Sequence, residues 1–254
     1  LYAFTNKGKI YRTDAHEIPI LTGEKSPSPV ADIFGFEDEE VLQAAISCEE
    51  LENHDFVVLA TRNGYVKRTP TTDFENIRST GIKAIEMDEQ DELRDAALSV
   101  EGDQILMSTD GGRTIRFPDQ DVRPMGRTAR GVIGIDVYDN SHVAALNVVD
   151  SDEERHVMAI TAKGYGKRTS LEEYRSQTRN GRGLKDIETG DRNCSVVDVQ
   201  APPSESKYIT VTKNGRTIYT ETSEVSVVSR NTKGVEIINL RPGDKVSSLS
   251  TINR

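Results

Sequence analysis

Aromatic residues are scarce in this chain of 254 residues: tryptophan is absent, and tyrosine and phenylalanine make up 6% of the sequence. Its core must therefore rest on Val, Ile, Leu and Ala. No apolar run approaches the roughly 18 residues that a membrane span needs, so no membrane partner is expected. The N-terminal residues already have the pattern of the middle of a strand, and we expect no signal peptide.

Cysteine is also rare, and Cys48 and Cys194 have no partner at a metal-binding or disulfide-framework spacing. We expect free thiols in a reducing cytoplasm. The four histidines lack a cysteine or carboxylate at ligand spacing, so no metal site is expected. A phosphate-loop lysine motif and a Gly-x-Ser-x-Gly elbow are missing as well. The sequence therefore predicts neither a catalytic residue nor a cofactor.

Positive charge does not dominate, since the formal net charge is -10. The charges are nevertheless unevenly placed: residues 37–40, 86–95 and 150–154 are acidic, whereas residues 112–131 and 161–183 are rich in arginine and lysine. In a regular array, position within a repeat becomes position on the solid. One rim is therefore expected to be basic and another acidic, and the local field decides what binds.

An internal repeat organises the chain. Thr-x-x-Gly-x-x-x-Arg begins at Thr5, Thr61, Thr109 and Thr161, and a fifth copy from Thr212 has Tyr219 in place of arginine. The turn glycines at 8, 64, 112, 164 and 215 are 56, 48, 52 and 51 residues apart. Such a period in a strand-rich sequence is typical of a propeller-like array with one small sheet per repeat. We predict an all-β fold and one domain over residues 1–254, with approximate repeats 1–56, 57–104, 105–156, 157–207 and 208–254.

Residues 105–149 illustrate one repeat. Residues 105–109 form an apolar strand, residues 110–112 a glycine turn, and residues 114–117 an alternating second strand. An arginine-rich loop over residues 123–130 leads to strands at 131–135 and 143–149. Four strands and three turns are expected to make one blade.

The second half of the repeat recurs at residues 81–85, 131–135, 183–187 and 234–238, where a glycine opens an apolar strand 17 to 19 residues after the turn glycine. A basic loop precedes each copy. The first repeat departs, because Pro29 replaces this glycine. We expect that blade to be shaped differently or to make fewer contacts.

The basic positions have two interpretations. Arginine on an exposed strand often pairs with a carboxylate or discourages edge pairing. The loop arginines favour phosphate, because guanidinium donates two bonds and small neighbours leave backbone N–H groups accessible. Interleaved aromatics for stacking unpaired bases are missing, so the expected partner is the duplex backbone, bound without base readout. The predicted DNA-binding residues are Lys67, Arg68, Arg78, Arg113, Arg116, Arg123, Arg127, Arg130, Lys167, Arg168, Arg175, Arg179, Arg182, Arg230 and Lys233.

Three segments carry a family resemblance: residues 63–70 (Asn-Gly-Tyr-Val-Lys-Arg-Thr-Pro), residues 122–131 (Val-Arg-Pro-Met-Gly-Arg-Thr-Ala-Arg-Gly) and residues 163–174. With the period, they make the whole chain resemble the C-terminal domain of the DNA gyrase A subunit. The resemblance implies a β-pinwheel of about five to six four-stranded blades that exchange strands with their neighbours. It also implies that duplex DNA wraps and bends around the basic perimeter, which lets a type IIA topoisomerase introduce negative supercoils.

The same resemblance implies a non-catalytic domain, since the catalytic tyrosine of the gyrase A protein belongs to another domain. Its partners would be double-stranded DNA, the rest of the gyrase A subunit and the gyrase B subunit, in the cytoplasm with the nucleoid. The signature box of the family, Gln-Arg-Arg-Gly-Gly-Lys-Gly, has its nearest match at residues 177–183, in the fourth repeat. We therefore expect a box-bearing blade upstream of Leu1.

Two further functions stay open. The topoisomerase IV relative commonly has five blades and a degenerate box, and would use this domain to select substrate geometry. A protein-interaction propeller would use the arginines to dock an acidic partner. A hydrolase propeller is disfavoured, because residues 57–60 and 157–160 are apolar where a central-channel site needs titratable groups.

Overall fold

The computed structural model describes residues 1–254 except 20–27, 76, 78–79, 151–153, 204–205 and 253–254. Its regular structure is mostly antiparallel β-sheet, as predicted. The chain divides into two compact units, residues 1–101 with 122–132 and residues 102–121 with 133–254. Each unit is described by itself.

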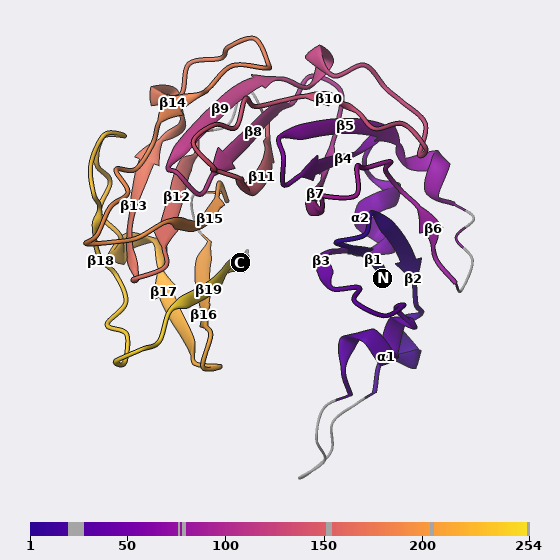
Figure 1. Ribbon diagram of the computed structural model, residues 1–254, viewed down its shortest axis with the longest axis horizontal. Helices are drawn as coiled ribbons and strands as arrows, with labels where there is room; N and C mark the ends of the chain where they lie inside the picture. The colour runs from indigo at the N-terminus through magenta and orange to yellow at the C-terminus, as the bar shows by residue number, and fades with distance from the viewer. Residues whose placement is uncertain (20–27, 76, 78–79, 151–153, 204–205, 253–254) are drawn as a thin grey trace. The chain divides into compact units, whose positions relative to one another are not determined.

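The first unit contains the sheets of the first and second repeats (Figure 1). The first sheet has the order β3-β1-β2-β6, with β1 (Tyr2–Thr5), β2 (Lys9–Arg12), β3 (Leu42–Ile46) and β6 (Ile82–Lys83). The second has the order β10-β5-β4-β7, with β4 (Phe56–Thr61), β5 (Tyr65–Pro70), β7 (Leu93–Ser99) and β10 (Val132–Ile133).

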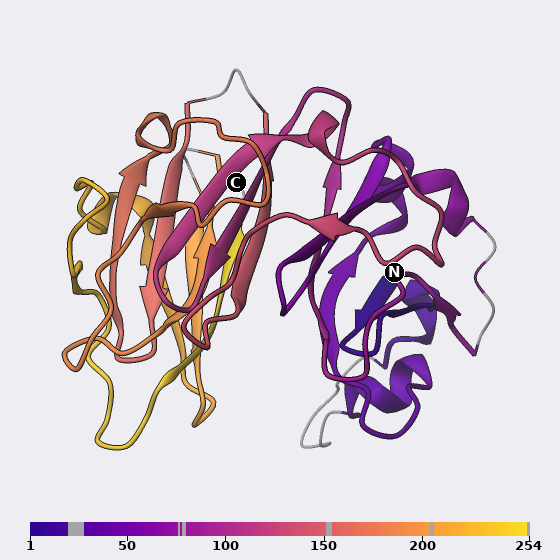
Figure 2. The same cartoon turned by 45° about the horizontal axis from the view of Figure 1, so that its top comes forward.

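The second unit contains the sheets of the other three repeats, which Figure 2 shows from another side. The third sheet has the order β11-β8-β9-β14, with β8 (Gln104–Thr109), β9 (Arg113–Pro118), β11 (Val143–Val149) and β14 (Leu184–Lys185). The fourth has the order β15-β12-β13-β18, with β12 (His156–Thr161), β13 (Tyr165–Ser170), β15 (Val196–Gln200) and β18 (Val235–Glu236). Within the described residues the fifth has three strands in the order β17-β16-β19, with β16 (Lys207–Thr212), β17 (Thr217–Glu221) and β19 (Val246–Ile252).

Four short strands complete the sheet of the preceding repeat. β6 pairs with β2, β10 with β5, β14 with β9 and β18 with β13. The expectation that each repeat builds its own four-stranded blade was therefore wrong for the strand that opens with glycine. The loop before this strand runs along the previous repeat and delivers the strand there. Exchange between neighbours, which the family resemblance implies, is what the structure contains.

The glycine before an exchanged strand has a steric cause. Gly131 has φ +97, and a Cβ added there would lie 2.5 Å from the carbonyl oxygen of Val66 on β5. A side chain would therefore be both strained and in collision with the strand that β10 joins. The first repeat lacks this glycine, and its residues form the helix α1 (Val30–Phe34) instead of a strand. The expected departure of the first repeat is thus a change of secondary structure.

The remaining helices are short. Ser47 caps α2 (Cys48–Glu52) through a capping box with Glu50, which satisfies backbone N–H groups at the helix start. The 3-10 helices are η1 (Ala15–Glu17), η2 (Thr71–Phe74), η3 (Asp119–Asp121), η4 (Leu171–Glu173) and η5 (Thr222–Glu224).

The core is aliphatic, with few rings, as the composition predicts. In the first unit Phe4, Val57, Leu59 and Phe74 share one buried cluster. In the second unit β11 contacts β15 and β15 contacts β19, whereas β14 and β18 lie at the opposite edges of their sheets. In the second unit, the exchanged strands β14 and β18 and the loops before them therefore occupy the sheet edges far from these packed strands. We call the loops over residues 123–131, 175–183 and 226–234 the exchange loops.

Candidate nucleic-acid interface

Each exchange loop is attached to the strand that bears the repeat arginine. The Met125 N–H donates to the carbonyl of Arg68, the Gln177 N–H to that of Arg116, and the Val228 N–H to that of Arg168, at 2.8 Å in each case. The backbone of the loop thus follows the preceding sheet in a repeated way. The alignment of each loop with its sheet decides which basic side chains are exposed to solvent.

The two lysines that precede the repeat arginines are interior. Lys67 is 0% exposed, and its Nζ donates to the carbonyls of Ala84 at 2.5 Å, Arg127 at 2.7 Å and Gly126 at 3.2 Å. Burial lowers the pKa of Lys67 to about 7. A phosphate cannot reach this ammonium, and sequence reasoning missed its burial because a single lysine among polar residues carries no signal of it.

Lys167 is 1% exposed and occupies the same place in the fourth repeat. Its Nζ donates to the carbonyls of Arg230 at 2.5 Å and Ser229 at 3.1 Å, and lies 3.3 Å from Oδ1 of Asp186. Burial lowers the pKa of this lysine, and the Asp186 carboxylate opposes the shift. The Tyr174 hydroxyl donates to Asp186 at 2.6 Å, and burial together with this contact raises the pKa of Tyr174. The pair is thus a satisfied buried ion pair.

The repeat arginines on the strands serve the fold. Arg68 is 3% exposed, donates from Nε to the Val122 carbonyl at 2.9 Å and lies over the Phe56 ring. Arg168 makes the equivalent bond to the Val225 carbonyl at 2.9 Å. The structural interpretation of this position therefore describes these arginines better than the DNA-binding one.

Arg116 completes this set. Its Nη1 donates to the Leu171 carbonyl at 3.3 Å, and burial lowers its pKa. As with Arg68 and Arg168, the acceptor belongs to a later segment of the chain. In the second, third and fourth repeats one guanidinium thus ties a strand to the chain that follows it.

A second periodic contact involves the basic residue just before the exchange glycine. Arg130 reaches Asp88 at 2.5 Å, Arg182 reaches Asp136 at 3.5 Å and Lys233 reaches Glu188 at 3.8 Å. Each acid follows the exchanged strand of the preceding repeat. Acidic and basic segments therefore meet here, and the expected separation of the two charges onto different rims is wrong at these positions. The ion pairs are largely exposed, so each contributes little to stability.

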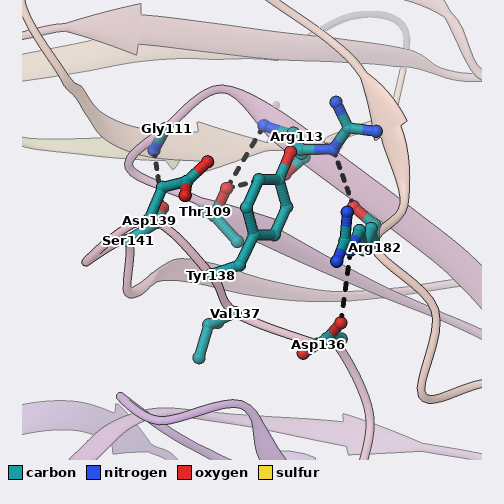
Figure 3. Close-up of a pocket in the computed structure, with 9 residues that line it drawn as sticks. All are labelled: Thr109, Gly111, Arg113, Asp136, Val137, Tyr138, Asp139, Ser141 and Arg182. Carbon is teal, nitrogen blue, oxygen red and sulfur yellow. Dashed lines mark hydrogen bonds and ion pairs between the residues drawn. The ribbon is translucent and has the colours of Figure 1, made fainter.

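Tyrosines accompany some of these cations. The guanidinium of Arg130 lies 4.1 Å from the Tyr65 ring centroid, and that of Arg182 lies 4.7 Å from the ring of Tyr138. Tyr65 thus packs beside its hairpin, with a cation on the ring. Figure 3 shows Arg113, Tyr138 and Arg182 around a small hollow in the second unit.

This hollow has a volume of about 130 Å³ and mixes charges of both signs. Arg113 donates to the carbonyls of Arg182 at 2.9 Å and Gly183 at 3.0 Å, and Asp136 faces Arg182 (Figure 3). Its cations are thus already engaged by the protein. The hollow itself is poorly suited to phosphate.

The other loop arginines divide into engaged and available groups. Arg179 donates to the carbonyls of Asp121 and Ile133, both at 3.1 Å, and Arg230 donates to that of Lys185 at 3.1 Å. By contrast, within the described residues no hydrogen bond or ion pair engages the guanidinium of Arg123, Arg127 or Arg175. Arg123 and Arg175 are exposed and Arg127 is half-buried. Arg78 lies outside the described residues.

Other kinds of site find no support in the described part of the chain. It contains no group of three or more His, Cys, Asp or Glu residues placed to hold a metal ion. None of its helices has the length and apolar character to cross a membrane. The basic loops are therefore the candidate functional surface.

Sheets that exchange one strand with a neighbour and carry arginine-rich loops at their edges define a β-propeller-like repeat domain. A family profile described as DNA gyrase C-terminal domain, beta-propeller, matches residues 1–23, 55–99, 103–150, 155–199 and 207–253. The chain belongs to this DNA gyrase C-terminal domain family. The resemblance seen in the three sequence segments is thereby confirmed.

Relatives of known identity agree. The chain is 36% identical to the DNA gyrase A subunit of Haloquadratum walsbyi, over 99% of this chain and 30% of the relative, and 35% identical to that of Staphylococcus epidermidis, over 98% and 28%. It thus spans about 30% of the length of these relatives. Solved structures of the gyrase A and topoisomerase IV C-terminal domains each superpose with a TM-score of 0.86, at 21% and 20% identity. They cover 99% of this chain and 82% and 78% of their own, and confirm the fold.

Proposed function

We propose that this chain binds duplex DNA without sequence preference and bends it along the outer edges of its sheets. One observation carries the proposal: the exchange loops have fixed backbones, while the guanidiniums of Arg123, Arg127 and Arg175 are left without a protein partner among the described residues. Planar guanidiniums on a held loop suit phosphate oxygens, which they contact without reading base edges. The family membership supports the same interpretation.

The structure reduces the number of candidate contacts. Of the fifteen predicted residues, one (Arg78) is not described and eight turn inward or bind carbonyls of the protein, which leaves six candidates; the eight are Lys67, Arg68, Arg113, Arg116, Lys167, Arg168, Arg179 and Arg230. Six contacts would give a slope of log affinity against log salt of about -5 at most. Bending about 40 base pairs through about half a turn costs roughly 10 kcal/mol, and contacts spread over several loops can offset it where one patch cannot.

We infer that in the whole protein this bending gives DNA strand passage a direction. A gyrase made of the complete A subunit and the B subunit would then introduce negative supercoils. The location would be cytoplasmic, with the chromosome. The relatives at 35–36% identity are gyrase A subunits, which favours this role over the substrate-selecting role of a topoisomerase IV domain.

The test measures binding of the 254-residue chain to duplexes of unrelated sequence at several salt concentrations. Similar affinities for all duplexes, together with a steep salt slope and a changed linking number in nicked plasmid that is ligated on the protein, are expected. The Arg123→Ala, Arg127→Ala and Arg175→Ala triple variant should lose affinity and flatten the slope. Arg62→Ala removes an exposed arginine from a hairpin turn and serves as the control. Equal binding by the triple variant and the control would refute the assignment.

A further inference from the structure

We propose that Lys67 and Lys167 are positioning residues for the DNA-binding loops: each holds two carbonyls of an exchange loop inside the protein and so fixes the backbone conformation of that loop. The inference rests on the proposed function. It assigns the lysines a role in binding although neither can touch DNA.

The geometry around Lys67 is a complete set of acceptors. An ammonium has three N–H groups, and those of Lys67 have the carbonyls of Ala84, Gly126 and Arg127 within 3.2 Å. The Nζ atom of Lys67 therefore joins the residue after the exchanged strand β6 to the loop in one contact. With the carbonyls of residues 126 and 127 turned inward, the Arg127 side chain has no hydrogen bond or ion pair among the described residues.

The fourth sheet repeats this arrangement in the same register. Lys167 is three residues after its turn glycine, as Lys67 is, and its loop acceptors Ser229 and Arg230 precede Gly234 by five and four residues, as Gly126 and Arg127 precede Gly131. Two copies of one contact, in different units of the chain, indicate a device of the repeat and exclude a local accident of packing.

The third sheet is the natural contrast. Ile115 occupies the lysine position there and is fully buried, so the sheet itself needs no lysine. Its exchange loop, residues 175–183, is held by Arg113 and Arg179, which donate to backbone carbonyls. Where the lysine is missing, arginines hold the loop instead. The lysine is therefore needed to hold the exchange loop and is not needed to form the sheet.

The experiment combines duplex binding with hydrogen exchange on the 254-residue chain. Lys67→Met should weaken binding about tenfold, or about 1.4 kcal/mol, because the loop holds its binding conformation only part of the time. The salt slope should stay unchanged, since Lys67 makes no phosphate contact. The amides of residues 125–130 should exchange faster while those of β4 keep their protection. Lys67→Arg should recover part of the affinity. Ile115→Met, the control, should change neither the affinity for duplex nor the exchange of the loop amides.

Lys67→Gln retains two donors without charge and replaces the methionine variant if that one fails to fold. A slope that falls by about 0.9 would mean that Lys67 contacts phosphate, and unchanged affinity with a destabilised sheet would mean a purely structural role; either result overturns the proposal. If the unaltered chain binds no duplex, the proposed function fails by itself. Loop exchange in Lys67→Met then still decides whether the lysine holds the loop.

Discussion

The exchange loops at residues 123–131 and 175–183 solve one structural problem in two ways. In the first, the buried ammonium of Lys67 binds the loop carbonyls, and Arg123 and Arg127 keep their guanidiniums clear of protein partners within the described residues. In the second, Arg113 and Arg179 bind backbone carbonyls themselves. The loop with the buried lysine thus leaves Arg123 and Arg127 available to a ligand, whereas the loop without it commits Arg113 and Arg179 to the fold and leaves Arg175 available. Counting arginines therefore overestimates the DNA-binding surface.

The largest effect is expected where the anchoring lysine has a carboxylate partner. Lys167→Met should lower the free energy of unfolding by about 3–5 kcal/mol, because it leaves the Asp186 carboxylate buried without its cation. Lys67→Met should cost less, since no such carboxylate pairs with it in the described residues. Urea denaturation measures both. The double variant Lys167→Met with Asp186→Asn should regain much of the loss; no recovery would show that the ion pair is not what matters.

The next effect separates available from engaged guanidiniums. Arg123→Ala with Arg127→Ala should reduce the salt slope by about 1.8 and weaken duplex binding roughly 50-fold at about 0.1 M salt, if counterion release is the whole term. Arg113→Ala with Arg179→Ala should leave the slope nearly unchanged, because those side chains bind the protein. Fluorescence titration over a series of salt concentrations distinguishes the pairs. If the two double variants have equal slopes of log affinity against log salt, the arginines of the two loops do not differ in their availability to DNA.

A smaller effect concerns pH. Burial lowers the pKa of Lys67 to about 7, below its value in the unfolded chain, so the unfolded state binds more protons between these values. Stability should therefore rise with pH above about 7, by about 1 kcal/mol between about pH 7 and 8. Denaturation curves of the unaltered chain and of Lys67→Met, measured at several pH values, isolate the contribution of Lys67 to the free energy of unfolding. If the difference in free energy between the two proteins stays constant with pH, the prediction is wrong.

The smallest effect is expected at the ion pair beside Tyr138. Asp136→Asn should change stability by less than about 1 kcal/mol, because the pair with Arg182 is half exposed. It should also strengthen duplex binding slightly at low salt, since Arg182 loses a competing anion. Parallel measurements on Asp110→Asn, which removes a neighbouring charge that is not paired with Arg182, provide the control. Weaker binding by Asp136→Asn would mean that the carboxylate orients Arg182.

Much of the fold was predictable from the period and the turn glycines. Strand positions such as 105–109 and 143–149 follow from apolar runs bounded by turns, and they correspond closely to β8 and β11. The destination of residues 131–135 did not follow from local pattern, because pairing with β5 is a contact between repeats. The helix α1, which follows Pro29 in the first repeat, was not predictable from local pattern either. Local periodicity specifies an element without specifying its neighbour.

The candidate site was predictable in kind and less so in detail. Charge clusters indicated the exchange loops, and Arg123, Arg127 and Arg175 stay candidates there. Lys67 and Arg68 are buried because their side chains donate to carbonyls of a loop more than fifty residues later in the chain. No short window of sequence contains both partners. Their predicted contacts with DNA accordingly give way to structural roles.

By itself, the sequence determined the repeat, the strand-rich class and the basic loops, because spacing of glycine, apolar residues and charge acts over a few residues. Only the tertiary structure decided which sheet each short strand completes and which cations are left over for a ligand. The physical reason is that a buried donor must find acceptors wherever the folded chain supplies them, and in this protein the neighbouring repeat supplies them.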